Sequence, residues 1–483
     1  MRSPFTGMWG LTGIGQALPL ARYNIGGKAP AVVADYSAGV YGLDGRAVTF
    51  DGLFDFARLS AAWKLNALGH WVKALAGVPR RGHHIWQGGK LVPAGLAVCS
   101  EVRTNLLLNS DALSTQVVTV AAVEHVLSFT GTGTVTLSGA ATDGPLIGAG
   151  TGEVNSVRLA FTPSAGPLTL TVSGDVQTAQ LEAGPFATDY ISTEAAQVST
   201  AAESLQIAPV ELARAVGVFG SELNPDPSFA TVWNTADGGI SAADGKLIFE
   251  DVAVNDRSFV VRSPATAGDT ILLEVDVDDL TSGALRFAIG GANNYALAAG
   301  KYSFLIPATT AASTIGVYAD TAPTNAVVSR FSARKVTMPV ALTFLMTGTM
   351  TRAKEPESSS NAIPLQWESD ADNFIDLRVS TAGAHTGKPS FRSKVGGVLT
   401  EVLGADDALA LGSEEAFALA FVLDATHIEG FYNGVSTGQT AHGGMAALLA
   451  APMQLLPVGS AIIKDLRLWP NALPSAAMVG ATS

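Results

Sequence analysis

The sequence has little of what several protein classes need. It holds a single cysteine, Cys99, in 483 residues, which excludes an internal disulfide framework and a cysteine-cluster metal site. Charged residues make up only 15% of the chain, and acidic residues outnumber basic ones to give a net charge of −13. A nucleic-acid partner is therefore not expected, because binding to a phosphate backbone requires a basic surface. No apolar run reaches about 18 residues, so no membrane span is expected either.

The apolar residues that are present follow the period of a β-strand. Hydrophobic types make up 47% of the chain and glycines number 51, whereas long helix-forming blocks are missing. From about residue 115 onward, apolar and polar residues alternate, as in "GTVTLSG", "PLTLTVSG" and "KYSFLIP". Each such stretch predicts an antiparallel strand with one buried and one wet face. The regular recurrence of turn residues favours an all-β chain of sandwiches over alternating strands and helices.

Breaks in this alternation suggest domain boundaries. The pattern stops near residues 208–228, which contain the two prolines of "NPDP", and again near 333–344. Segments 105–205 and 220–336 echo one another, which indicates two related sandwiches. The polar stretch "TRAKEPESSSNAI" at 351–363 predicts an exposed loop inside the last domain.

The segment at residues 54–77 is ambiguous by periodicity alone. Its apolar residues lie near helical spacing, yet a hairpin with its turn at "NALG" fits nearly as well. The residues leave both interpretations open.

No motif predicts catalysis, a metal or a cofactor. His83 and His84 are adjacent, so in a strand they point to opposite sides and do not share one metal ion. Cys99 lies in the apolar stretch "GLAVCS", which favours packing over nucleophilic chemistry. Acidic pairs occur, but solvated charge is the common role of such pairs, and the sequence has no GxSxG, phosphate loop or HExxH. We therefore expect a protein that is not an enzyme and holds no cofactor.

A few aromatic residues stand beside polar ones, as in a sugar-binding site. An aromatic ring offers a flat apolar face to a sugar, and neighbouring polar groups bind its hydroxyls. Packing in the core or at a sheet edge is the commoner role of such rings. The candidate carbohydrate-binding residues are Trp367 and Arg378, in a stretch with Asn373 and Asp376, and Tyr432 with Asn433.

Several separate blocks resemble bacteriophage and prophage structural proteins. The first is a Phe-x-Arg-x-Ser opening at 56–60 followed by a Val-Pro-Arg at 78–80. The second, "EVRTNLLLNS" at 101–110, contains Arg103, Thr104, Asn105, Leu106, Leu107 and Asn109. The third is "QLEAGPFATDYI" at 180–191. Segments of this kind resemble carbohydrate-binding-module jelly rolls carried on tail fibres and other virion appendages.

The resemblance extends to the rest of the chain and implies its domains. The middle part is similar to another phage-associated jelly roll. The last part, with "FYNGVSTGQT" and "AIIKDLRLWPNALPSAAM", is similar to the concanavalin A/laminin-G-like lectin fold, with a hairpin turn at Asn433–Gly434 and a short closing helix. The resemblance also favours the hairpin at 54–77. The expected order is an attachment arm at 1–45, a hairpin and first jelly roll at 46–208, a second jelly roll at 217–336 and a lectin-like sandwich at 337–483.

Residues 103–109 are expected to mark the fold rather than bind a ligand. Arg103, Asn105 and Asn109 would fix turns through side-chain hydrogen bonds. The leucines at 106–108 would be buried on both sides, as in a strand covered on both faces.

The function that this resemblance implies is display of β-sandwiches on a virion for recognition of host glycans. Expected partners are other virion proteins, bound through the N-terminal region, and a host surface glycan, with a homotrimer as the usual assembly of fibres. We expect assembly in the host cytoplasm, because glycine and proline interrupt the N-terminal apolar stretch that a signal peptide would need. Two alternatives stay open, namely a purely structural head fibre, decoration or baseplate protein, and a polysaccharide-degrading spike.

Overall fold

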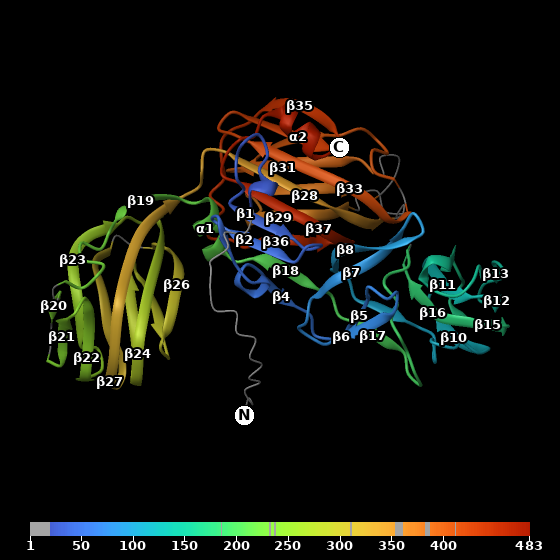
Figure 1. Cartoon of the computed structure of the whole chain (residues 1–483), viewed down its shortest axis with the longest axis horizontal. Coiled ribbons are helices and arrows are strands. Elements are labelled where there is room, and N and C mark those ends of the chain that lie inside the picture. Colours follow the sequence, from blue (N-terminus) through green and yellow to red (C-terminus); the bar gives the residue numbers. More distant parts are fainter. Residues whose placement is uncertain are drawn as a thin grey trace.

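The computed structural model describes residues 20–184, 186–230, 233–235, 238–309, 312–352, 361–381, 387–410 and 412–483. It confirms the predicted all-β class, because strands dominate and the two α-helices are short. Three β-sandwich units are visible, and Figure 1 shows the two jelly rolls on either side of a larger sandwich that contains the C-terminus. Residues 1–19 of the predicted attachment arm, and residues 353–360 of the predicted loop, lie outside the described residues.

The large sandwich has one sheet of ten strands and one of seven. In spatial order, the ten-stranded sheet holds β3 (Arg46–Ala47), β2 (Val40–Leu43), β1 (Val32–Asp35), β37 (Ser460–Trp469), β28 (Leu342–Arg352), β33 (Gly412–Leu423), β34 (His427–Tyr432) and β35 (Val435–Ala441), with β8 (Lys90–Cys99) beside β37 and β7 (Arg80–Gln87) beside β8. The seven-stranded sheet holds β32 (Val398–Leu403), β31 (Pro389–Val395), β30 (Asn373–Ser380), β29 (Asn361–Asp370), β36 (Met453–Val458), β18 (Ser204–Ile207) and β4 (Asp55–Ala57).

The first jelly roll is inserted between β8 and β18. Its sheets contain β10 (Gln116–Val120), β15 (Gly166–Ser173), β12 (Thr134–Gly139) and β13 (Leu146–Ile147), and β14 (Val157–Phe161), β11 (His125–Gly131) and β16 (Val176–Ala183). At its base, β9 (Arg103–Asn105) pairs with β17 (Val198–Thr200), so the chain enters and leaves the unit side by side. Leu127, Phe129 and Leu170 are among its fully buried core residues.

The second jelly roll is inserted between α1 (Pro209–Val216) and β28. It is a nine-stranded sheet wrapped around its own core, made of β19 (Val218–Glu222), β20 (Asn234–Thr235), β21 (Ile240–Ala243), β22 (Lys246–Val252), β23 (Arg257–Ala265), β24 (Thr270–Ile289), β25 (Ala292–Ala296), β26 (Gly300–Pro307) and β27 (Ala312–Thr337). Short 3-10 helices lie at η1 (Leu20–Tyr23), η2 (Phe50–Gly52) and η3 (Glu153–Asn155), and α2 (Ser475–Ala481) is the short closing helix expected near the C-terminus.

The N-terminal part of the chain belongs to the large sandwich. The predicted boundaries assign residues 32–43 to an attachment arm and residues 55–57 and 204–207 to the first jelly-roll unit. The structure instead pairs Val33 with Arg467 across β1 and β37, and Gln206 with Gln454 across β18 and β36. These pairings join segments hundreds of residues apart, and alternation within a strand carries no information about its distant partner.

The predicted hairpin at 54–77 is confirmed in place of the helix. Strands β5 (Ala62–Leu65) and β6 (Trp71–Ala74) pair antiparallel, and the turn falls at "NALG". The Asn66 side chain accepts hydrogen bonds from Leu68 N and His70 N, and Gly69 takes a positive φ of 75°. The predicted Asn433–Gly434 turn between β34 and β35 is likewise confirmed, with positive φ at both residues.

A buried ion cluster joins the hairpin, the first jelly roll and the large sandwich. Glu203 Oε1 accepts hydrogen bonds from Arg58 Nη1 at 2.5 Å and Arg80 Nε at 3.0 Å, and Oε2 from Arg80 Nη2 at 2.7 Å. Oε2 also accepts from Cys99 N at 2.8 Å, at the end of β8, and Asp189 pairs with Arg80. Arg58 also donates hydrogen bonds to the carbonyls of Ala74, Leu75 and Val78. These carbonyls lie at and just after the end of the second hairpin strand, β6. We name the set Arg58, Arg80, Asp189 and Glu203 the Glu203 cluster.

We predict that Glu203→Gln loosens the hairpin and the base of the first jelly roll. The substitution leaves two buried guanidiniums without their carboxylate, which costs about 3–5 kcal/mol in comparable sites. Hydrogen–deuterium exchange of the hairpin at 62–74, and of the β9–β17 pair at the base of the jelly roll, should therefore accelerate. The control is Glu250→Gln, which removes an exposed carboxylate from β22 and should change exchange in neither segment. Unchanged exchange in Glu203→Gln would show that the cluster does not hold these elements.

Candidate functional site

The outer face of the seven-stranded sheet carries a continuous row of polar side chains. Backbone register places each member directly opposite the next on the neighbouring strand, from one edge of the sheet to the other. Every strand contributes one residue. We name this set the polar row, and in spatial order its members are Asp55, Gln206, Gln454, Gln366, Asp376, Arg392 and Glu401.

Alternation along each strand directs the polar row outward. The residues before or after its members, such as Leu365, Ile375 and Met453, belong to the core between the two sheets. The two edge members, Asp55 and Glu401, are exposed. Gln454 is exposed as well, Gln206, Gln366 and Arg392 are half-buried, and Asp376 is buried. The row therefore runs along the face that points away from the core, and its central carboxylate is covered by neighbouring side chains.

The centre of the polar row is held rigidly by charge. Asp376 has no exposed surface and accepts a bidentate pair from Arg392, with Nε to Oδ1 at 2.8 Å and Nη2 to Oδ2 at 2.7 Å. Arg378 Nε donates to Oδ2 of the same carboxylate at 3.1 Å. The Arg392 guanidinium also lies 5.0 Å from the ring centre of Phe374. Two cations thus surround one anion, and the carboxylates of Glu368 and Glu401 lie close to the Arg392 guanidinium, so the centre of the face carries fixed charges of both signs with hydrogen-bonding amides beside it.

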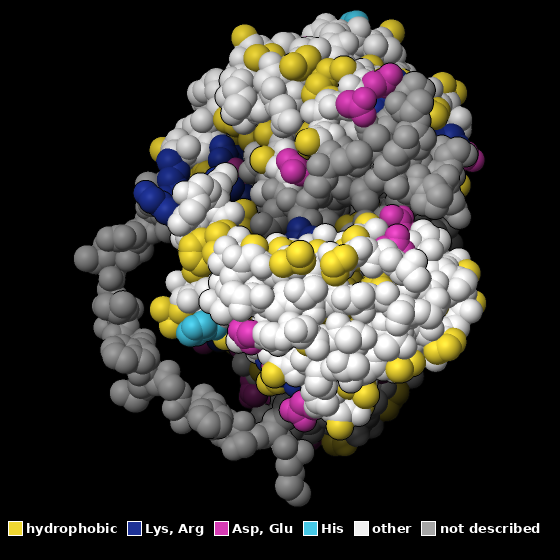
Figure 2. All heavy atoms as spheres, turned by 90° about the vertical axis from the view of Figure 1, so that its right-hand side faces the viewer, with side chains coloured by type: hydrophobic (Ala, Val, Ile, Leu, Met, Phe, Trp, Pro, Cys, Tyr) yellow, Lys and Arg dark blue, Asp and Glu magenta, His cyan; other side chains and the backbone are white. Residues whose placement is uncertain are grey.

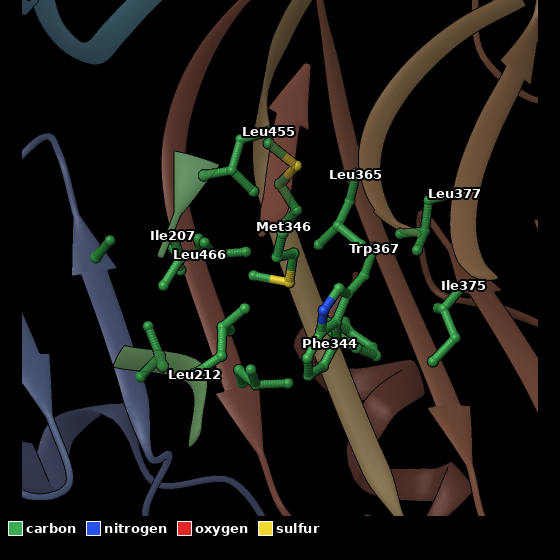
Figure 3. Packing of buried hydrophobic residues seen from close by; sticks show 14 of the residues in the cluster. Ile207, Leu212, Phe344, Met346, Leu365, Trp367, Ile375, Leu377, Leu455 and Leu466 are labelled. Carbon is green, nitrogen blue, oxygen red and sulfur yellow. The ribbon is translucent and has the colours of Figure 1, made fainter. Parts of the chain in front are cut away.

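The structure separates the four predicted carbohydrate-binding residues. Only Arg378 lies on the face that carries the polar row. Trp367 has no exposed surface and lies in the core beside Phe344, as Figure 3 shows, and its Nε1 donates to Leu448 O at 2.8 Å and Ala451 O at 3.0 Å. The alternation of β29 explains this position, because Trp367 shares its face with Leu365. Sugar stacking on the Trp367 ring is therefore excluded in this structure.

Tyr432 and Asn433 end a strand of the other sheet and serve the fold there. The Tyr432 ring is buried, and its hydroxyl accepts a hydrogen bond from Ala405 N at 3.0 Å. Asn433 adopts a positive φ of 42°, and its side chain accepts from Ala418 N at 3.0 Å. Neither residue meets Trp367 or Arg378 at a common surface, since the two pairs belong to different sheets.

Sequence reasoning missed most of the polar row. Asp376 and Arg378 were noticed because they follow Trp367 in one stretch. Gln206, Gln366 and Gln454 each look like an ordinary outward-facing residue of an alternating strand. Their alignment depends on cross-strand register, which one sequence does not reveal.

The motif at 103–109 works as a fold element in the structure. Asn105 Nδ2 donates to Ala179 O and Ile191 O, both at 2.9 Å, and its Oδ1 accepts from Leu107 N and Leu181 N. Arg103 Nη1 donates to Ala183 O at 2.9 Å. The motif thereby ties its own strand to the block at 180–191.

Other members of this motif also make local bonds, although the leucines differ from expectation. The Thr104 hydroxyl lies 2.7 Å from that of Ser199, Leu106 N donates to Leu181 O, and Asn109 has a positive φ of 49°. Leu107 is fully buried, whereas its two neighbours are only half-buried. Residues 106–108 form no strand, so they are not covered on both faces as predicted.

His83, His84 and Cys99 are the other residues that the sequence singled out. His83 is buried and His84 half-buried, and burial lowers the pKa of the His83 imidazole. Burial likewise raises the pKa of the Cys99 thiol, which disfavours the reactive thiolate. Within the described part of the chain, no group of three or more metal-ligating side chains occurs. No helix of that part is long and apolar enough to cross a membrane.

A cavity of about 440 Å³ lies where the second jelly roll meets the large sandwich. Its apolar wall includes Met338, Met445 and Leu449, and the Lys335–Asp269 ion pair borders it. The opposite end of the molecule differs: Figure 2 faces the first jelly roll, whose visible surface is mainly uncharged with isolated acidic groups.

No protein-family model and no curated protein matches the chain. The chain is similar to a number of solved structures, and three of them are described here. The CBM40 of a Ruminococcus gnavus IT-sialidase, bound to alpha2,3 sialyllactose, has 12% identity and a TM-score of 0.24, with 30% of this chain and 83% of that chain covered. Domain 4 of AbnA, a Geobacillus stearothermophilus arabinanase in complex with arabinotriose, has 11% identity and a TM-score of 0.24, covering 44% and 100%. A SAP-like pentraxin from Limulus polyphemus has 8% identity and a TM-score of 0.23, covering 48% and 84%. Likeness at these TM-scores carries no argument about the ligand of this chain.

We predict that Trp367→Phe lowers the free energy of unfolding and leaves the polar row unchanged. Two buried carbonyls, Leu448 O and Ala451 O, lose their donor, at a cost of about 1–3 kcal/mol. Chemical denaturation followed by circular dichroism measures the change. The matched control is Trp86→Phe, because Trp86 Nε1 has no hydrogen-bond partner among the described residues. Equal destabilisation by the two substitutions would contradict the assigned role of the Trp367 hydrogen bonds.

Proposed function

We propose that this protein binds glycans through the polar row of its large sandwich. The observation that carries the proposal is the alignment of three glutamines, three carboxylates and an arginine across all seven strands of one sheet. A sugar presents hydroxyls that both donate and accept hydrogen bonds. Amide side chains match both roles, and the ion-paired centre supplies fixed charge for orientation.

The spacing of the row suits an extended saccharide. Neighbouring strands lie about 4.8 Å apart, so the row repeats hydrogen-bonding groups at that interval across the sheet. Such a surface makes many weak bonds rather than one tight pocket, because each exposed polar contact exchanges with water. Binding of this kind becomes strong only when several copies act together.

We further propose that the chain is a virion appendage protein, such as a tail fibre, that acts as a homotrimer at the host surface. The support is the resemblance of the blocks at 56–60, 78–80, 101–110 and 180–191 to phage structural modules. In these blocks, Arg58 and Arg80 bind Glu203 where the chain leaves the inserted jelly roll, and Arg80 also pairs with Asp189 of that unit. Asn105 ties the first strand of the jelly roll to the carbonyl of Ala179 within the same unit. Attachment to other virion proteins through the N-terminal region belongs to the same proposal.

Two alternatives make different predictions. A purely structural head fibre, decoration or baseplate protein would be present on virions but would not bind host cells. A polysaccharide-degrading spike needs two free carboxylates facing one cleft. In the polar row, the central carboxylate of Asp376 is occupied by two arginines, so we propose binding without cleavage. New reducing ends after incubation with host polysaccharide would contradict that part.

We predict that the double substitution Gln206→Ala and Gln454→Ala weakens glycan binding about fivefold to a hundredfold. It removes two hydrogen-bonding groups, each worth about 0.5–1.5 kcal/mol, from adjacent strands of the row. The measurement is binding of the purified chain to a panel of immobilised bacterial surface polysaccharides.

The matched control for this pair is Gln87→Ala with Gln439→Ala. These two exposed glutamines belong to β7 and β35 of the ten-stranded sheet, so the same groups are lost away from the row. The control should bind like the unaltered protein. Equal loss in both variants, or equal retention, would contradict the role of the polar row.

We also predict that antibodies against this chain label virions at an appendage in electron microscopy. The N-terminal region would lie against the particle, and the sandwiches would project outward. Absence of label from purified virions of a phage that encodes the chain would contradict the appendage proposal while leaving glycan binding to be judged by its own measurement.

A further inference from the structure

The seven-stranded sheet ends at an exposed edge strand, β32. This strand of six residues pairs with β31 on one side without any shift of register, and no strand of the described residues pairs with its other side. It contains no proline, no lysine and one charged residue, Glu401. A regular edge of this kind presents unpaired backbone N–H and C=O groups, which are a template for another strand.

The other edges of the large sandwich carry features that block pairing. The opposite edge strand of the same sheet, β4, has only three residues, and β3 of the ten-stranded sheet has only two. The register of β35 to β34 shifts once, and that of β7 to β8 shifts twice. Short strands and bulges are usual protections of a sheet edge, and β32 has neither.

The core of the large sandwich is also open at this edge. Val402 is buried between the sheets, and alternation places Val398 on the same face of β32. Val398 is nevertheless 70% exposed. Strand β35 lies beside β32, and its Val435 is 46% exposed although it lies opposite the core residue Tyr432. Each sheet therefore leaves a core-facing valine uncovered, and a second apolar surface over both would stabilise the edge.

Strand β32 is complementary to its own copy. In an antiparallel pairing about a two-fold axis, both subunits use the same surface, so every contact occurs twice. A pairing centred on Thr400 sets Val398 of each copy opposite Val402 of the other. It also brings the two Thr400 side chains together, and threonine pairs are favourable across strands.

The same pairing covers the open end of the core. Ala405 N, just after β32, donates a hydrogen bond to the Tyr432 hydroxyl, so the Val402 end of the strand lies beside Tyr432 and Val435. Val398 of the second copy arrives at this end. The exposed core-facing valines of the two copies thereby come together.

Charge does not oppose this pairing. Glu401 lies opposite Arg392 of its own sheet and accepts a hydrogen bond from Ser390 Oγ. In the pairing centred on Thr400, Glu401 lies opposite Leu399 of the second copy. Direct opposition of two like charges, which destabilises a sheet, is thus avoided.

We propose that β32 pairs antiparallel with β32 of a second copy of this chain, about a two-fold axis at Thr400. The two seven-stranded sheets then form one continuous sheet. The interface rests on the strand edge and not on glycan binding. Its consequence for the proposed function is that the polar row, which ends at Glu401, continues on the second copy with an offset along the strands. A two-fold contact joins chains in pairs, so a homotrimer would form through other surfaces.

Oxidative cross-linking tests this pairing directly. Thr400→Cys places a thiol on the two-fold axis, where cysteines of neighbouring antiparallel strands lie within reach of a disulfide. Copper-phenanthroline oxidation of the purified chain at about 10 μM should then give a covalent dimer on a non-reducing gel. The matched control is Thr119→Cys, an exposed threonine of β10 at the edge of the first jelly roll, which should give no dimer.

A charge on the open edge should break the pairing. Val398→Lys puts an ammonium where Val402 of the second copy would lie. It should weaken association about tenfold or more in analytical ultracentrifugation, because lysine on a strand edge opposes pairing. Val117→Lys, at a 62% exposed position of β10, is the control and should associate like the unaltered protein.

The cross-link decides between the possible occupants of the edge. Absence of a Thr400→Cys dimer, or equal cross-linking through Thr119→Cys, would overturn the proposal. A cross-link from Thr400→Cys to a different virion protein, in place of a second copy, would overturn it as well. The cross-link also decides the question if Val398→Lys does not fold. Glycan binding has its own measurement with the Gln206→Ala and Gln454→Ala protein, so the two proposals fail separately.

Discussion

The rest of the molecule depends on one interaction, the buried ion pairs of the Glu203 carboxylate with Arg58 and Arg80. It lies where the chain returns from the first jelly roll, and Glu203 N donates to Cys99 O where the chain departs. The two arginines that the carboxylate binds come from the segment between β4 and the hairpin and from β7. A buried ion pair is costly to form, so its value lies in the specific arrangement that it fixes rather than in net stability. Here that arrangement joins the ends of a long insertion.

This arrangement also shapes the candidate glycan surface. Arg58 directly follows β4, and Glu203 directly precedes β18. Their ion pair lies directly beside the paired strands β4 and β18. In that pairing Ala57 lies opposite Ser204, and Asp55 lies opposite Gln206. Two of the seven positions of the polar row therefore rest on the Glu203 cluster. The remaining positions come from strands whose buried faces pack around Trp367 and Phe344.

The sequence predicted the local structure well because local patterns determine it. Alternation located strands such as β12, β15 and β26, and the Asn433–Gly434 pair located one hairpin turn. The residues at 54–77 left helix and hairpin open, and the resemblance to phage modules favoured the hairpin that the structure shows. The sequence did not predict that the N-terminal strands complete the last sandwich, since that requires pairing between Val33 and Arg467. The polar row could not be predicted for the same reason, because it depends on pairing between distant strands. Trp367 was read as a ring near polar groups, and only the sheet shows that it faces the core while Asp376 faces out.

The central claim is that the outer face of the seven-stranded sheet is the glycan-binding surface. Its most direct test is a crystal structure of the protein soaked with an oligosaccharide from a surface polysaccharide that it binds. The account predicts ligand density across β36, β29 and β30, with sugar hydroxyls within hydrogen-bonding distance of Gln454 and Gln366. Density for the chain-like ligand at the cavity beside Met338 or on either jelly roll, with an empty polar row, would contradict it.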